Sequence, residues 1–235
     1  MAPPAGRCAR KLNAICQSAA VLRSAIAGIL LAAFTPLNAL AAGDKAGDFE
    51  FYVLALSWSP TYCQSRGATA DRGQCSGQSD RAFVVHGLWP QYERGYPENC
   101  ATNEALRVPR SLIDTILDIM PSPGLVGGQW RKHGTCTGLT QLAYLQTVRR
   151  AFDTVTIPEA FRSAVRRQSV SARGAEQAFI AENPGLSANG IAIACRGGLL
   201  SEVRICLTRG LEFRRCANVD ASGCRQSRLA MPADR

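Results

Sequence analysis

The segment Phe83-Val84-Val85-His86-Gly87-Leu88-Trp89-Pro90 holds one of only two histidines in this chain of 235 residues. Its first half is apolar and β-branched, which predicts a buried strand over residues 82–86 with His86 at its end. An earlier stretch of the same kind, Phe51 to Trp58, predicts a second buried strand. Residues 65–80, between them, are rich in Gly, Ser, Asp and Gln and predict a loop.

The second histidine lies in Gln129-Trp130-Arg131-Lys132-His133-Gly134-Thr135-Cys136. Imidazole, with an ordinary pKa of ~6.5, can both accept and donate a proton near neutral pH. His86 and His133 can therefore act as base and acid in one reaction, while Lys132 places a positive charge on a developing anion. This set suits RNA cleavage without a metal. The substrate 2′-hydroxyl is then the nucleophile, so no Ser or Cys nucleophile is needed.

Periodic patterns in the rest of the chain predict the other elements. Helices are expected over Ser111–Met120, from an N-cap at Thr140 to Phe152, over Pro158–Gln168 and over Ala175–Glu182. Strands are expected over Gly190–Cys195 and Glu202–Leu207, with a turn at Gly197-Gly198. Strands, then helices, then strands indicate a single α+β domain. The final segment, Arg225 to Arg235, shows no pattern and is expected to be disordered.

The first 41 residues have the layout of a secretory signal. Basic residues surround the start of an apolar run, Ile26 to Phe34, which is shorter than the ~20 residues of a membrane-spanning helix. The small residues of Ala39-Leu40-Ala41 predict cleavage after Ala41, and an uncleaved anchor is the less favoured alternative. We therefore expect a signal peptide at 1–41 and an exported domain at 42–235, in the periplasm or outside the cell.

Eight cysteines lie beyond the predicted signal: Cys63, Cys75, Cys100, Cys136, Cys195, Cys206, Cys216 and Cys224. An even set in an exported domain indicates disulfides rather than a metal site. Proximity in sequence predicts the pairs Cys63–Cys75, Cys195–Cys206 and Cys216–Cys224. The formal charge is +9, and loss of the four basic residues of the signal leaves +5. This charge suits a polyanionic partner, although ordinary surface charge explains it equally well.

The two histidine segments resemble the active-site motifs of the ribonuclease T2 family, HGLWP and W-x-K-H-G-T-C. The likeness extends to residues 54–63 and to Glu202–Cys206, and so covers nearly all of the mature chain. It implies a ribonuclease T2-like α+β fold, in which a largely antiparallel central sheet is surrounded by helices and held by disulfides. It also implies a Cys100–Cys136 bond, which would tie the His133 segment to the region after His86.

The resemblance implies an endoribonuclease that cleaves single-stranded RNA through a 2′,3′-cyclic phosphate to 3′-phosphate ends. His86, Lys132 and His133 would carry catalysis, and Trp89 would hold a base. Tyr92 and Tyr96 either extend a stacking platform or are half-buried loop aromatics. Some relatives have a base-reading aspartate where this chain has Gln91, so broad base preference is expected. The expected partner is RNA, with no metal or cofactor, and the chain is expected to be a monomer.

One departure from the family pattern is Gly128-Gln129, where His-Glu is usual. Gly128 offers no imidazole, and Gln129 lacks the carboxylate that would orient Lys132. We expect Gln129 to remain a catalytic helper and the pKa of His133 to fall for want of a negative neighbour. The alternative is a catalytically weakened member that binds RNA or another polyanion. A metallohydrolase is poorly supported, because two histidines leave few ligands once the cysteines form disulfides.

Overall fold

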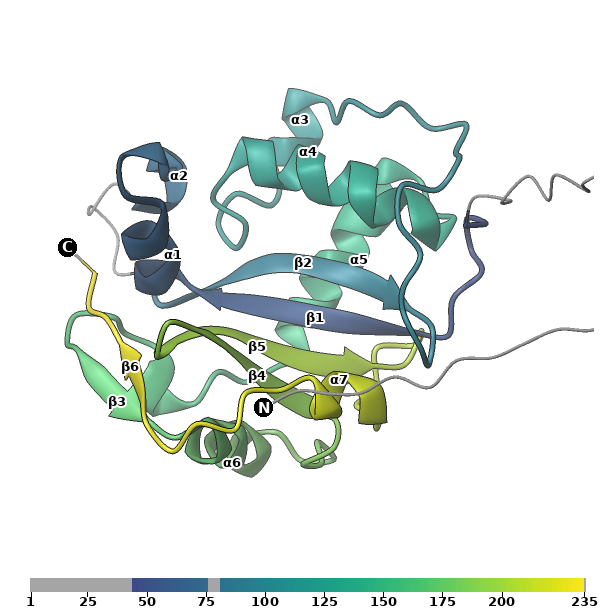
Figure 1. The fold of residues 1–235 in the computed structure, drawn as a ribbon. Helices are drawn as coiled ribbons and strands as arrows, with labels where there is room; N and C mark the ends of the chain where they lie inside the picture. Colours follow the sequence, from purple (N-terminus) through teal and green to yellow (C-terminus); the bar gives the residue numbers. More distant parts are fainter. Residues whose placement is uncertain (1–43, 76–80, 235) are drawn as a thin grey trace, which may run out of the picture. The chain divides into compact units, whose positions relative to one another are not determined.

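The computed structural model describes residues 44–75 and 81–234, so the predicted signal peptide lies outside the described residues. The described part is built on a six-stranded sheet in the order β2-β1-β5-β6-β3, with β4 also paired to β5 (Figure 1). The strands are β1 (Phe51–Trp58), β2 (Phe83–Gln91), β3 (Gln168–Val170), β4 (Ile191–Arg196), β5 (Leu199–Leu207) and β6 (Leu229–Met231). Every pairing is antiparallel except a single parallel contact between β5 and β6, which confirms the largely antiparallel sheet.

β1 lies between β2 and β5, and its alternating side chains divide the molecule into a core and a site face. Tyr52, Leu54 and Leu56 point into the main hydrophobic core, where each is at most 3% exposed. Val53 and Ser57 face the other way and line two pockets. One face of β1 therefore stabilises the fold while the other forms part of the site.

Helices pack around this sheet. They are α1 (Ser59–Arg66), α2 (Arg72–Cys75), α3 (Arg110–Asp114), α4 (Pro123–Lys132), α5 (Gln141–Asp153), α6 (Ala172–Glu182) and α7 (Ala217–Ala221). Figure 1 shows α3, α4 and α5 gathered beside β2, with α6 near β4. Ser122, Thr140 and Ser171 cap α4, α5 and α6, because each side-chain oxygen accepts a hydrogen bond from a backbone N–H of the first turn.

Several predicted elements are confirmed, including the strand over Phe51–Trp58 and the helix that Thr140 caps. Others are wrong in extent. The helix expected over Ser111–Met120 is helical only at Arg110–Asp114 before it breaks into turns. The loop expected over residues 65–80 contains α2. The strand at His86 runs on to Gln91, so His86 is inside the strand and not at its end.

The helix predicted over Pro158–Gln168 is wrong, because this stretch forms a 3₁₀ turn at Glu159–Phe161 and no α-helix. Phe161 and Ala164 are both buried, and their spacing of three residues mimics a helical face. The chain then has to extend, because Gln168–Val170 forms β3 against β6. Tertiary pairing of an edge strand therefore overrides a short helical pattern.

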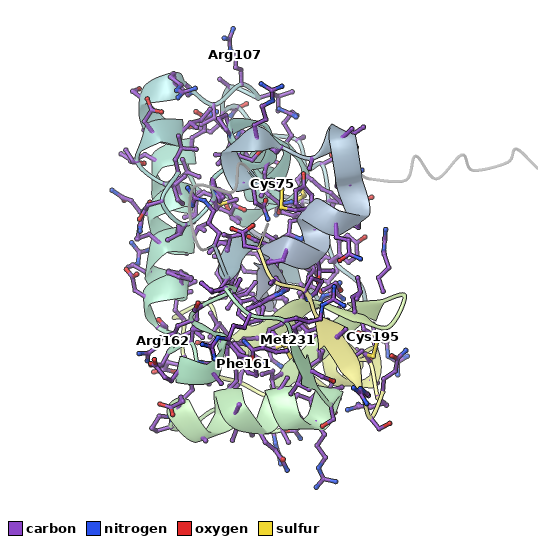
Figure 2. The ribbon with its side chains drawn as sticks, turned by 90° about the vertical axis from the view of Figure 1, so that its left-hand side faces the viewer. Cys75, Arg107, Phe161, Arg162, Cys195 and Met231 are labelled. Carbon is purple, nitrogen blue, oxygen red and sulfur yellow. A yellow bond between two sulfur atoms is a disulfide. The ribbon has the colours of Figure 1, made fainter. Side chains whose placement is uncertain are left out.

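The C-terminal segment, expected to be disordered, is instead part of the fold. Leu229–Met231 forms β6, and Leu229 and Met231 are fully buried (Met231 is labelled in Figure 2). Trp58 Nε1 donates a hydrogen bond to the carbonyl oxygen of Pro232 at 3.0 Å. A strand of three residues has too little pattern to be predicted from sequence, and β6 depends on partners far away in the chain.

Two of the predicted disulfides, Cys63–Cys75 and Cys100–Cys136, are confirmed. The other two predictions are wrong, because the structure pairs Cys195 with Cys224 and Cys206 with Cys216. β4 and β5 form a hairpin in which Cys195 pairs with Leu200, six residues from Cys206. At ~3.3 Å per residue, Cys195 and Cys206 lie roughly 20 Å apart, well beyond the ~7 Å limit between bonded Cα atoms.

Truncating Met231 tests the role of β6. We expect Met231→Ala to lower the free energy of unfolding by about 2–5 kcal/mol, because it opens a cavity beneath the sheet. Denaturant unfolding followed by circular dichroism measures this loss. Leu142→Ala, at a side chain 47% exposed on α5, serves as the control and should change stability by less than about 0.5 kcal/mol. Equal effects of the two changes would contradict the packing of β6.

Candidate active site

A β-bulge at His86 creates the site. Ala55 pairs with Gly87 and Leu56 pairs with Val85, so His86 is an extra residue with no partner in β1. Side chains alternate along a strand, and His86 and Trp89 would face opposite sides of a regular one. The extra residue shifts the alternation by one and brings both side chains to the site face, where they line the same pocket.

All eight residues predicted to act in catalysis or substrate binding line this pocket, which has a volume of about 630 Å³: His86, Trp89, Gln91, Tyr92, Tyr96, Gln129, Lys132 and His133. Trp89 is at its centre. The ring centroids of His86 and His133 lie 5.3 Å and 5.4 Å from that of Trp89. Tyr96 is 6.0 Å from His133 and 47% exposed, so it is open to a ligand.

His86 contacts a carboxylate from β5, the strand on the other side of β1. Its Nδ1 lies 2.5 Å from Oε1 of Glu202 on β5, and the other oxygen of Glu202 accepts hydrogen bonds from Arg204 at 2.9 and 3.1 Å. Burial raises the pKa of Glu202, but the hydrogen bond and charge of His86, together with Arg204, outweigh it and leave the pKa below its usual value. Glu202 is therefore ionised, and it fixes the His86 ring with Nε2 directed away from it.

His133 has a different environment. It follows directly after α4, and its side chain is buried with no hydrogen-bond partner for Nδ1 among the described residues. Burial, with the charges of Lys132 and His86 as smaller causes, lowers its pKa to about 3. Without a ligand, this imidazole is neutral across the physiological range, and a neutral ring can accept a proton.

Lys132 ends α4 and lines the pocket. Its Nζ lies 3.0 Å from Oε2 of Glu98 and 5.5 Å from the centre of the Tyr96 ring. The hydrogen bond to Glu98 is the main cause that raises the pKa of Lys132. Lys132 is therefore a cation at neutral pH, and it forms an ion pair with Glu98.

The Ribonuclease T2 family model matches residues 49–216, which include every residue placed in the pocket so far. The chain belongs to the ribonuclease T2 family. It is 37% identical over 186 residues to a ribonuclease of Aeromonas hydrophila, an alignment that covers 77% of this chain and 82% of the relative. It is 28% identical over 225 residues to ribonuclease I of Escherichia coli K12, covering 77% and 84%.

A solved structure confirms the ribonuclease T2-like fold. Trichomaglin, described as a novel S-like ribonuclease, superposes with a TM-score of 0.64 at 20% sequence identity. The match covers 80% of this chain and all of trichomaglin.

Gln129, which replaces the usual family glutamate, is 8% exposed and is packed into the site. Its Oε1 accepts a hydrogen bond from Trp89 Nε1 at 2.7 Å. Gly87 allows this contact, because a Cβ there would overlap the Gln129 oxygen and lie 2.5 Å from Trp89 Nε1. Gln129 thus positions Trp89. Gly128 faces open space, so this ribonuclease T2 family member has room for a side chain where it lacks the family histidine.

Sequence reasoning gave no role to Glu202, Arg204 or Glu98. A signal for the first two was present, because two charged residues two apart on a largely apolar predicted strand must share one face. The α7 residues Asn218 and Val219 also line the pocket, and the Cys206–Cys216 bond holds the start of that helix to β5. Across the described ranges, no three His, Cys, Asp or Glu side chains are grouped to hold a metal ion.

Restoring the family carboxylate tests the environment of His133. Gln129→Glu keeps the acceptor for Trp89, and the new negative charge should raise the pKa of His133 by about one to three from its value near 3. The acidic limb of the pH–rate profile should move to higher pH. NMR titration of the two imidazoles, assigned with His86→Ala, measures this change.

Gln146→Glu is the matched control, because it adds the same charge at an exposed position of α5 outside the pocket. It should leave the pKa of His133 unchanged. An unchanged pKa in Gln129→Glu as well would show that position 129 does not influence His133.

Proposed function

We propose that this chain is a metal-independent endoribonuclease that cleaves single-stranded RNA by transphosphorylation, through a 2′,3′-cyclic phosphate to 3′-phosphate ends. The observation that carries the proposal is the presence of two imidazoles with opposite environments in one pocket, both about 5 Å from Trp89. Cleavage at a 2′-hydroxyl needs one group to take a proton and another to give one. The family relationship and the ribonuclease relatives support the same activity.

The two environments support the following proton roles. Neutral His133 takes the proton of the 2′-hydroxyl as O2′ attacks phosphorus, and the anionic phosphate then stabilises the charge that His133 gains. His86, whose Nδ1 lies 2.5 Å from Glu202, gives its Nε2 proton to the departing O5′. In the second step, His86 activates water and His133 returns a proton to O2′, which opens the cyclic phosphate. Lys132 offers positive charge to the phosphate.

A second pocket of about 780 Å³ adjoins the first and shares His86 with it. We assign the nucleoside that carries the attacking 2′-hydroxyl to the first pocket, beside His133. The leaving nucleoside then occupies the second pocket, with His86 at the boundary where O5′ departs. This arrangement places each proton carrier next to the oxygen that it serves.

Base recognition in the first pocket depends on aromatic surfaces, from Trp89, Tyr92 and Tyr96. Stacking on such surfaces tolerates any base. Gln91 also lines this pocket, but it is 9% exposed and its amide donates to the carbonyl oxygen of Pro90 at 2.9 Å. These features support a broad base preference.

We also propose that the mature chain is exported, to the periplasm or beyond, and acts as a monomer on RNA. The signal-like pattern at residues 1–41 supports export, as do the four disulfides in the described chain. No helix within the described residues has the length and apolar character needed to span a membrane.

Removing either imidazole tests the proposed activity. His86→Ala and His133→Ala should each lower kcat for a fluorogenic RNA oligonucleotide by about 10²–10⁴-fold, because each removes one proton carrier. The oxidised wild-type protein should keep its activity in excess chelator and release cyclic phosphate ends. The exposed variant Leu142→Ala should match the wild type.

If folded wild-type protein cleaves no faster than the two histidine variants, the endoribonuclease proposal fails. Retained RNA binding in that case would favour the catalytically weakened alternative.

Glu202→Gln tests the support of His86. The amide has nearly the same shape but no charge, so we expect kcat to fall by about 10²-fold through loss of the imidazolium partner and of ring orientation. Steady-state kinetics across pH would show the loss in kcat more than in KM. Glu182→Gln, exposed on α6, is the matched control. Unchanged kinetics in Glu202→Gln would remove Glu202 from the mechanism.

A further inference from the structure

The two pockets meet at two side chains. Among the described residues that line them, only His86 and Arg204 belong to both. An RNA chain that places one nucleoside in each pocket must pass its connecting phosphate through this boundary. Arg204 is therefore a cation next to the position of the scissile phosphate.

The guanidinium of Arg204 is fixed before any ligand binds. Nε and Nη2 both donate to Oε2 of Glu202, and the group lies 5.5 Å from the centre of the Trp89 ring. Two of its five N–H groups are thus occupied, and Nη1 has no hydrogen-bond partner within the described part of the chain. The side chain is 33% exposed, so its remaining donors can reach a ligand.

The backbone explains this placement. Arg204 pairs with Ala55 across β1 and β5, and Ala55 also pairs with Gly87, beside the His86 bulge. Ala55, the β1 residue between these two positions, is fully buried and carries only a methyl group. His86 and Arg204 therefore flank one position on the sheet from its two sides, and Glu202 joins them.

Among the described cations that line the pockets, Arg204 alone lines both, because Arg66 and Arg196 line only the second pocket. Glu202 is shared with His86, while Glu93 in the first pocket pairs with Arg214 at 2.5 Å. Asp71 in the second pocket accepts from Ser122. Lys132 lies only in the first pocket and pairs with Glu98.

We propose that Arg204 binds a non-bridging oxygen of the scissile phosphate and stabilises the charge that builds up on it, an inference that rests on the proposed endoribonuclease function. As the O2′–P bond forms and the P–O5′ bond breaks, one proton passes from O2′ to His133 and another from His86 to O5′. The non-bridging oxygens carry the excess negative charge at the midpoint. A preoriented guanidinium contributes most when charge develops on its acceptor.

Phosphorothioate substrates test this contact. One non-bridging oxygen of a single cleavable linkage is replaced by sulfur, giving separate Rp and Sp oligonucleotides, and kcat/KM is compared with the oxygen substrate. For the wild type, one diastereomer should react more slowly because sulfur is a weak acceptor. Arg204→Gln should lower kcat/KM for the oxygen substrate by about 10²–10³-fold and reduce that diastereomer's sulfur effect towards one.

Arg204→Lys is a second variant, which keeps the charge without the planar fork and guards against loss of folding in Arg204→Gln. It should fall between the wild type and Arg204→Gln. Thermal unfolding and the NMR signal of His86 show whether either variant disturbs the fold or the imidazole. Arg166→Gln removes an equal charge at an exposed residue that lines neither pocket, and should leave every ratio unchanged.

Two outcomes overturn the inference. Activity of Arg204→Gln within about threefold of the wild type would show that the guanidinium is not used. A large loss of activity with both sulfur effects unchanged would show that Arg204 acts only through Glu202. Either result leaves the endoribonuclease proposal intact, provided that the wild type cleaves RNA and depends on both histidines.

Discussion

The site depends on one extra residue in a strand. The bulge at His86 lets β2 present His86 and Trp89 on the same face while Val85 and Leu88 remain in the core. Deletion of one residue here would send every side chain beyond it to the opposite face. Gly87 belongs to the same constraint, because only a residue without a Cβ leaves space for the hydrogen bond between Gln129 and Trp89.

The two imidazoles differ in their hydrogen-bond partners and in their burial, because one comes from the sheet and the other follows a helix. His86 lies on the sheet beside a carboxylate that also binds Arg204, whereas His133 follows the end of α4, is buried, and has no such partner among the described residues. Groups with similar chemistry acquire separate roles when their surroundings differ. Here Glu202 fixes the ring of His86, whereas burial lowers the pKa of His133.

Sequence was sufficient for the α+β class, for β1 and for eight of the residues that line the pocket, because motifs and strand periodicity are local signals. It was insufficient where distant pairing decides. The Cys195–Cys224 and Cys206–Cys216 bonds follow from the antiparallel register of β4 and β5, and β6 exists only beside partners remote in sequence. The ion pair between Glu98 and Lys132 was not predicted for the same reason, since no periodic pattern links the two positions.

The Cys100–Cys136 bond makes the covalent structure of the site region depend on the compartment that holds the protein. Cys136 lies three residues after His133, and Cys100 lies two residues after Glu98, the partner of Lys132. The cytosol keeps thiols reduced, whereas oxidising compartments outside it form the bond. Under the proposed export, a newly made chain lacks the covalent link between these two segments while it is in the cytosol with the transcripts of its own cell. On that route the bond forms only after export, so oxidation would separate synthesis of the chain from covalent linkage of the two segments.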